Sequence, residues 1–153
     1  MPTKECGSGL HGFLWGEGNS NLANWAEDAK WLVFSAEESE IIDLGGKIKC
    51  RRPVVEFCGD RYSATQYLFQ NGGRGRAIIG ITLTGGNGSK LTGGNGSWLT
   101  GGNGSMLICA YYDEKGRRRI ATGFVEDGGL SPNISYRVNS SGEFVAQNRE
   151  TKS

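Results

Sequence analysis

The chain has 153 residues, enough for one domain or for a compact domain with a small appended module. Its 17 Lys and Arg balance 16 Asp and Glu, so no overall electrostatic field draws it to nucleic acid or anionic lipid. We therefore expect neither DNA nor a membrane as a partner. The sequence has no apolar run of roughly 18 residues and no apolar signal core after Met1, which predicts a cytoplasmic protein.

The four cysteines are Cys6, Cys50, Cys58 and Cys109, and none belongs to a Cys-x-x-Cys pair. The single histidine, His11, is far from Cys50 and Cys58 in the sequence. This spacing is not typical of a zinc site, and we expect no metal and no cofactor. Buried free thiols are the favoured interpretation, with disulfides or a metal site as the alternatives.

Residues 1–76 have the pattern of a small α+β domain. An extended segment leads to Trp15, and apolar residues at helical spacing predict helices at 21–30 and 61–70, the second capped by Asp60. Short runs of β-forming residues, separated by glycine or proline, predict strands at 31–35, 40–43, 47–51 and 54–57. Lys47, Lys49 and Arg51 alternate in the third run, so we expect them on its solvent face.

Residues 85–108 are three near-identical copies of the octad Gly-Gly-Asn-Gly-Ser-x-Leu-Thr, and a degenerate copy at 77–84 precedes them. A fixed repeat period takes precedence over local signals when a fold is predicted. The four copies predict a short β-solenoid over residues 77–108. The Gly-Gly-Asn-Gly segment supplies residues that accept positive φ, as a tight corner requires.

The even length of the octad predicts which side chains face the interior. Strand side chains alternate with period two, so the serine and the leucine of every octad return to one face. Leu91, Leu99 and Leu107 should stack in one interior column or in closely apposed columns. Lys90, Trp98 and Thr100 should point outward. Four octads are too few for a solenoid to be stable alone, so both ends need caps.

The C-terminal part, residues 109–153, has the pattern of such a cap. The strand that begins at Met106 should continue to Tyr112, turn at 113–116 and return as an antiparallel strand at 119–125. A further hairpin is predicted from 134–138 and 143–146. The whole chain is therefore expected to be mainly β: an α+β N-terminal cap, a short β-solenoid and a C-terminal β-hairpin cap.

The repeats and the sequence after them carry a resemblance to a known family. The octad, the run from Ser105 to Ile108, Tyr111-Tyr112-Asp113 and the segment from Gly128 to Val138 resemble the last repeats and C-terminal cap of bacterial ice-nucleation proteins. The resemblance covers about half of the chain. The front half, with Cys6-x-x-Gly9-Leu10-His11 and Gly59-Asp60-Arg61, is similar to a domain of uncharacterised bacterial and phage proteins that carry octad arrays.

The resemblance implies ice binding, but the outward residues of this chain disfavour it. In the ice-nucleation family the outward positions read Thr-x-Thr over many coils. Here only Thr82-Leu83-Thr84 keeps that pattern, and the later octads place Lys90, Trp98 and Met106 at the first position. We expect ice binding to be lost.

A small-molecule site in the N-terminal part is the second functional hypothesis. Trp15 and Trp25 could form aromatic walls, and Arg61 could stack on a base or bind a phosphate. The Leu10-His11-Gly12 segment is similar to the start of ADP-ribosyltransferase-like folds, in which a His-Gly pair holds a dinucleotide. Core packing of the tryptophans and a hydrogen-bonded core histidine are the structural alternatives.

The first functional hypothesis is a non-catalytic interaction protein of a bacterial host, a phage or prophage accessory factor. Its capped array would present Lys90, Trp98 and Thr100 to a protein partner or to a second copy of the chain, because an exposed aromatic side chain on a stiff strand commonly anchors an interface. The alternative is sequestration of a nucleotide-like ligand by His11, Trp15, Trp25 and Arg61. An enzyme that uses His11, of the ADP-ribosyltransferase-like kind, is third, and an ice-binding protein is also less favoured.

Overall fold

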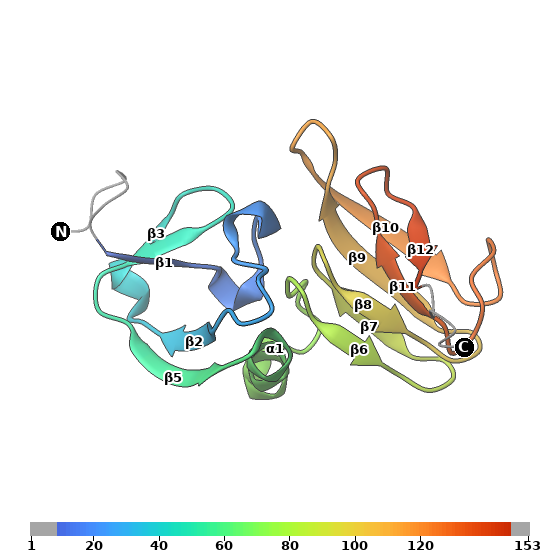
Figure 1. The fold of residues 1–153 in the computed structure, drawn as a ribbon, viewed down its shortest axis with the longest axis horizontal. Coiled ribbons are helices and arrows are strands. Elements are labelled where there is room, and N and C mark those ends of the chain that lie inside the picture. The colour runs from blue at the N-terminus through green and yellow to red at the C-terminus, as the bar shows by residue number, and fades with distance from the viewer. Residues whose placement is uncertain (1–8, 148–153) are drawn as a thin grey trace.

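A computed structural model describes residues 9–147 of the chain. Strands dominate that part, with one α-helix and four short 3-10 or π turns among the described residues. Figure 1 shows the N-terminal strands in one half of the molecule, the repeat and C-terminal strands in the other, and helix α1 between them. The predicted mainly-β fold is confirmed. The strands belong to several small sheets rather than to one closed solenoid.

The N-terminal half contains two small antiparallel sheets. In the first, β4 (Ile48–Cys50) lies between β1 (Leu10–Gly12) and β3 (Ile41–Asp43). The second pairs β2 (Trp31–Ser35) with β5 (Val54–Gly59), with an irregularity between Val33 and Phe34. The strands predicted at 31–35, 40–43, 47–51 and 54–57 are therefore present, with ends shifted by up to two residues. Short 3-10 turns at Leu14–Gly16 and Glu38–Glu40 connect these strands.

The prediction that Lys49 lies on the solvent face is wrong. Its side chain is completely buried, with 0 % of its surface exposed. Lys49 lies in the central strand of the first sheet, where it is paired with His11 of β1 and Ile42 of β3. A strand with neighbours on both edges and packing on its faces has no solvent side, and charge alternation along a short strand does not reveal that placement.

The helix predicted at 21–30 is also wrong. The structure has only a 3-10 turn at Ser20–Leu22, and the chain is then irregular up to β2. The indole N–H groups of Trp25 and Trp31 donate to the backbone carbonyls of Ser20 (2.8 Å) and Asn24 (3.1 Å), and the Asn24 side chain accepts from Ala26 N. These contacts hold the segment in an open conformation, so tertiary packing overrides a weak helical pattern.

Helix α1 (Arg61–Leu68) begins where the sequence predicts. The Asp60 carboxylate accepts a hydrogen bond from Ser63 N at 2.7 Å, which satisfies one of the free N–H groups of the first turn. The helix continues as a π turn at Phe69–Gly73, and the helical path breaks inside this turn at Gly72, which has a φ of +109°. Only a residue without a Cβ adopts this φ at low cost, which explains why the helical path stops there.

The octads form two parallel strand pairs that belong to different sheets. Strand β6 (Thr82–Thr84) pairs with β8 (Trp98–Thr100), and β7 (Lys90–Gly93) pairs with β9 (Met106–Tyr112). Leu83 is therefore opposite Leu99, and Leu91 is opposite Leu107. The four leucines share one buried core between the two sheets. The leucines were expected in one interior column or in closely apposed columns, and the structure shows two apposed columns.

Serines and glycines shape the ends of these strands. Ser97 Oγ donates to Ile78 O at 3.0 Å, and Ser105 Oγ donates to Gly86 O at 3.0 Å while it accepts from Ser89 N at 3.2 Å. Ser97 and Ser105 are buried, as the octad pattern predicts. The last glycine of each corner has a φ near +70°, at positions 88, 96 and 104. Each corner therefore turns the chain from one sheet to the other.

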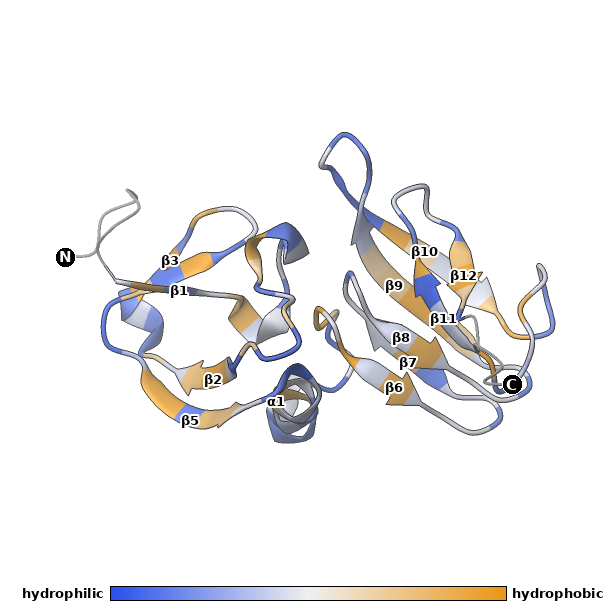
Figure 2. Cartoon of the chain, in the orientation of Figure 1, coloured by the Kyte–Doolittle hydropathy of each residue, from blue (hydrophilic) through white to orange (hydrophobic). Residues whose placement is uncertain are grey.

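C-terminal strands flank the repeat strands on one side, and helix α1 contacts them on the other. Strand β10 (Arg118–Phe124) pairs antiparallel with β9, and β11 (Ser135–Val138) pairs antiparallel with β8 and with β12 (Phe144–Ala146). On the other side, Gln66 Nε2 of α1 donates to Thr82 O of β6 at 2.7 Å. Each repeat strand carries a hydrophobic band beside pale or hydrophilic residues, and the turns between the strands are pale to hydrophilic (Figure 2).

Candidate functional site

The strongest candidate surface surrounds Trp98 on strand β8. Because Leu99 points into the core, Trp98 and Thr100 point to the outer face of the sheet formed by β12, β11, β8 and β6. Thr82 and Thr84 are their partners on β6. The guanidinium of Arg137 lies 5.6 Å from the centre of the Trp98 ring, a cation–π distance. We call these five residues the Trp98 surface.

Lys90 does not belong to this surface, although the sequence analysis grouped it with Trp98 and Thr100. It lies on β7, in the sheet formed by β10, β9 and β7, with Met106 as its strand partner. Lys90 is exposed, as predicted, but it faces away from the other sheet. Successive octads alternate between two sheets that face each other through the leucines, so outward residues of neighbouring octads point in opposite directions.

A cavity of about 960 Å³ lies in the N-terminal half. Residues of β1, β2, β3, β4 and α1 line it, and most of the lining is apolar or aromatic, including Trp31 and Phe34. Lys30 and Asp43 supply charged groups of both signs. Concave, mostly apolar sites with a few polar groups are the usual form of a small-molecule site, and this volume lies at the upper end of their range.

Only two of the four residues predicted to bind a ligand line this cavity. They are His11 and Trp15. His11 is exposed, so the interpretation of it as a buried structural histidine is wrong. Trp15 is 37 % exposed and has a φ of +54°, the left-handed region that a bulky residue rarely adopts. Its ring lies against Gly72, and the Arg76 guanidinium lies 5.3 Å from the ring centre.

The other two residues, Trp25 and Arg61, instead pack against the corners of the repeat. A Cβ at Gly96 would lie 2.7 Å from the Trp25 ring, and a Cβ at Gly80 would lie 3.0 Å from both Trp25 and Arg61. Arg61 lies 5.3 Å from the centre of the Trp25 ring. The structure therefore places these residues where the N-terminal half meets the repeat, and glycine at the corners permits the close approach.

The described cysteines differ in exposure. Cys50 and Cys109 are buried free thiols, as predicted, whereas Cys58 is exposed and corrects the prediction for that residue. Burial raises the pKa of the Cys109 thiol to about 12. Cys6 lies outside the described residues. Among residues 9–147 no group of three His, Cys, Asp or Glu side chains is placed to hold a metal ion.

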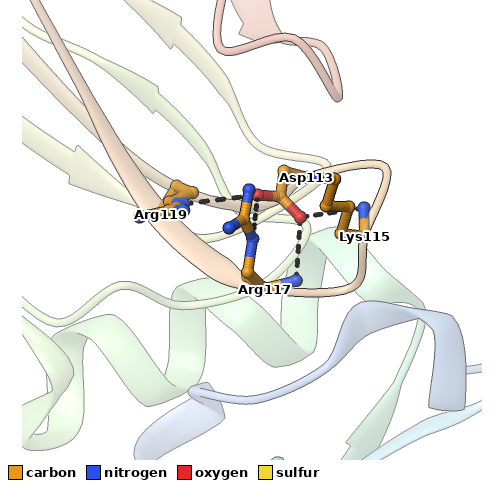
Figure 3. A network of polar contacts seen from close by, with 4 residues as sticks. All are labelled: Asp113, Lys115, Arg117 and Arg119. Atoms are coloured by element: carbon orange, nitrogen blue, oxygen red, sulfur yellow. Dashed lines mark hydrogen bonds and ion pairs between the residues drawn. The ribbon is translucent and has the colours of Figure 1, made fainter.

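A polar network holds the turn between β9 and β10 (Figure 3). The Asp113 carboxylate accepts from the backbone N–H groups of Arg117 and Lys115, both at 2.9 Å, and from the side chains of Arg117 (2.9 Å) and Arg119 (3.3 Å). These hydrogen bonds lower the pKa of Asp113 to about 2. The hydrogen bond from the Arg117 backbone is the largest cause, ahead of those from the arginine side chains. The Asp113 carboxylate therefore partly neutralises the positive charge of Lys115, Arg117 and Arg119 at this turn.

The exposed apolar residues of strand β10 were not predicted from the sequence. Ile120 is 70 % exposed and Phe124 is 49 % exposed, although each lies in a seven-residue strand with an unbroken register to β9. Ala121 faces the core, so Ile120, Thr122 and Phe124 share the outer face. The signal was available: the alternation in 120–124 places small Ala121 and Gly123 inward and the larger Ile120, Thr122 and Phe124 outward.

Comparisons with known proteins agree with the resemblance seen in the sequence. The chain is 37 % identical over 68 residues to an ice nucleation protein of Pseudomonas syringae, 36 % over 72 residues to one of Pseudomonas fluorescens, and 33 % over 72 residues to one of Pantoea ananas. These matches cover 43 to 46 % of this chain but only 6 to 7 % of the relatives. No family model and no solved structure matches the chain.

The similarity contradicts the expected cytoplasmic location. Ice nucleation proteins are anchored at the surface of the outer membrane, which conflicts with that expectation even though the match covers a fragment of them. The hydropathy of the given sequence was therefore insufficient grounds for the prediction. Within residues 9–147, no helix is both long enough and apolar enough to cross a bilayer.

Proposed function

We propose that this chain is a non-catalytic interaction protein whose repeat strands form a short, capped β-solenoid that binds another protein chain. The partner is a protein or a second copy of the chain, and the chain serves a phage or prophage as an accessory factor. Residues 1–76 and 109–153 act as the two caps. The similarity to ice nucleation proteins supports a repeat-containing interaction protein that is not catalytic.

The observation that carries the proposal is the Trp98 surface. Trp98 is half-buried and has the Arg137 guanidinium over its ring. The next residue of the strand, Leu99, is 1 % exposed and fixed in the core. An aromatic side chain held on a stiff strand loses little conformational entropy on binding, which is typical of interface anchors. Only the first octad keeps a Thr-x-Thr pattern on the outer face, so we do not propose ice binding.

A photo-crosslinking side chain in place of Trp98 tests this proposal. Thr92 is the matched control, because it is also an outward, half-buried position of an octad but lies on the opposite sheet. The proposal expects a covalent adduct of defined mass, formed in cells or by the purified protein with itself, from position 98 and not from position 92. Adducts at both positions or at neither contradict it.

The second candidate function is sequestration of a nucleotide-like ligand in the N-terminal cavity. Its volume of about 960 Å³ and its lining by His11, Trp15 and Trp31 favour this candidate. Lys30, also in the lining, could bind a phosphate. Trp25 and Arg61 have no part in it, since they pack against glycine corners.

Thermal unfolding in the presence of a nucleotide panel tests this second candidate. A ligand at one hundred times its dissociation constant should stabilise the folded protein by about 2.7 kcal/mol. Trp31→Ala should abolish the shift, whereas Trp98→Ala, which changes a residue outside the cavity lining, should leave it intact. An unchanged melting temperature with every nucleotide would exclude this function and would leave the interaction proposal untouched.

A further inference from the structure

Strand β7 has an unpaired edge at the N-terminal end of the repeat. It is the last strand of its sheet, in the order β10-β9-β7. Met106 N donates to Ser89 O at 2.8 Å, so Ser89 and the odd-numbered residues of β7 direct their main-chain groups toward β9. The N–H and C=O groups of Lys90 and Thr92 therefore point away from the sheet. Within residues 9–147, no hydrogen bond reaches these four groups.

The fold leaves room for one more strand at this edge. In the repeat a strand pairs with the one sixteen residues earlier, which for β7 would be residues 74–76, but these residues form a turn. Helix α1 lies beside β6 (Figure 1), where Gln66 Nε2 donates to Thr82 O. A groove of about 790 Å³ lies between α1 with its π turn and the strands β6 and β7. The N-terminal half thus covers the edge of β6 and leaves the edge of β7 open to another strand.

The groove is basic. Of the described residues that line it, only Arg74 and Lys90 are charged, and both are exposed. The Arg74 guanidinium lies 4.9 Å from the centre of the Phe69 ring, which holds this charge at the groove. A second copy of β7 at this edge would bring like charges together, which opposes self-association there. The charge therefore favours an acidic segment of a different protein.

We propose that β7 binds an acidic extended segment of another protein, which adds as a parallel strand to its open edge. An acidic side chain of this segment lies opposite Lys90. The next residue is apolar and lies opposite Leu91, so that it extends the row that Leu91 forms with Leu107. Main-chain hydrogen bonds join the apolar residue to Lys90 O and Thr92 N, as in other cases of strand addition. This second binding site goes beyond the Trp98 surface, which lies on the opposite sheet.

The octad itself supplies a probe for this site. A fluorescent peptide of sequence Gly-Gly-Asn-Gly-Ser-Glu-Leu-Thr-Gly carries Glu at the position that Lys90 has in its own octad. Fluorescence anisotropy in low salt should show saturable binding of this Glu peptide to the wild-type protein. A matched peptide with Lys in place of Glu should bind at least about tenfold more weakly.

Charge reversal on the protein tests the contact. The double variant Arg74→Glu, Lys90→Glu should prefer the Lys peptide to the Glu peptide, and this preference would also show that the variant is folded. Trp98→Ala should retain the wild-type preference, because Trp98 lies outside the groove. If the Glu peptide does not bind the wild-type protein, or if the preference does not reverse, the proposed site is wrong.

Methylation of single peptide nitrogens separates strand pairing from charge attraction alone. In the proposed register the Leu N–H of the probe donates to Lys90 O, whereas its Glu N–H points away from β7. The Glu peptide methylated at the Leu nitrogen should lose binding, and the one methylated at the Glu nitrogen should bind as the parent does. Equal binding of the two methylated peptides would overturn strand addition, and the opposite order would overturn the parallel direction. None of these results depends on crosslinking from position 98, so failure here leaves the Trp98 surface standing.

Discussion

Replacement of Leu99 by Ala should destabilise the protein more than any substitution at an outward position of the octads. Leu99 is 1 % exposed and is paired with Leu83 on one side and Tyr136 on the other. Re-exposure of a buried leucine costs about 1.5 to 3 kcal/mol. The two sheets are joined by corners in which Gly94 and Gly102 lie tightly against neighbouring backbone and side-chain atoms, so the sheets cannot collapse fully into the space that the side chain leaves. The cavity term raises the loss to about 2 to 5 kcal/mol.

Denaturation by urea, followed by far-ultraviolet circular dichroism, measures this loss. Lys90→Ala is the matched control, because Lys90 begins the neighbouring repeat strand but is exposed, and its removal should cost no more than about 0.5 kcal/mol. A damaging Lys90→Ala with a neutral Leu99→Ala would mean that the strand faces are inverted, and the assignment of the octad core would be refuted.

Three further predictions concern other parts of the molecule. Gly96→Ala should destabilise the protein by about 1 to 3 kcal/mol more than Gly104→Ala in the same denaturation assay. Both glycines have a φ near +70°, but only Gly96 lies against Trp25. Equal losses would show that Trp25 does not pack against the Gly96 corner. The Asp113 carboxyl should titrate near pH 2 by NMR, and because its pKa is lowered from 3.8, its contribution to stability is present above pH 3.8 and is lost as the pH falls toward 2; titration at an ordinary pH would contradict the network. A thiol reagent at pH 8 should modify Cys58 quickly and Cys109 only on unfolding, because Cys109 is buried and its pKa is about 12; rapid modification of Cys109 would show that the core is open.

The repeat was predictable from the sequence because its period is a geometric constraint. An even repeat fixes which side chains face inward, and this placed Leu99 and Ser97 correctly. The period does not reveal that successive octads belong to different sheets, and for that reason Lys90 was grouped with Trp98. In that arrangement each of the first two repeat strands pairs with the strand sixteen residues later in the sequence. The pattern of a single octad does not determine that pairing.

The N-terminal half was less predictable because contacts distant in sequence determine it. The segment at 21–30 was predicted to be helical from apolar spacing, but Trp25 bonds to the Ser20 carbonyl and packs on the Gly96 corner, more than 70 residues away. Lys49 was predicted to be solvated because it is charged, and it is buried between two strands. Of the candidate ligand residues, His11 and Trp15 could be assigned to a common cavity only in three dimensions.

Photo-crosslinking from position 98 tests the central claim most directly. We expect a covalent adduct of defined mass, formed in cells or by the purified protein with itself, from a crosslinking side chain in place of Trp98. The same side chain in place of Thr92, on the opposite sheet, should form no adduct. Adducts at both positions, or at neither, would contradict a protein-binding surface around Trp98.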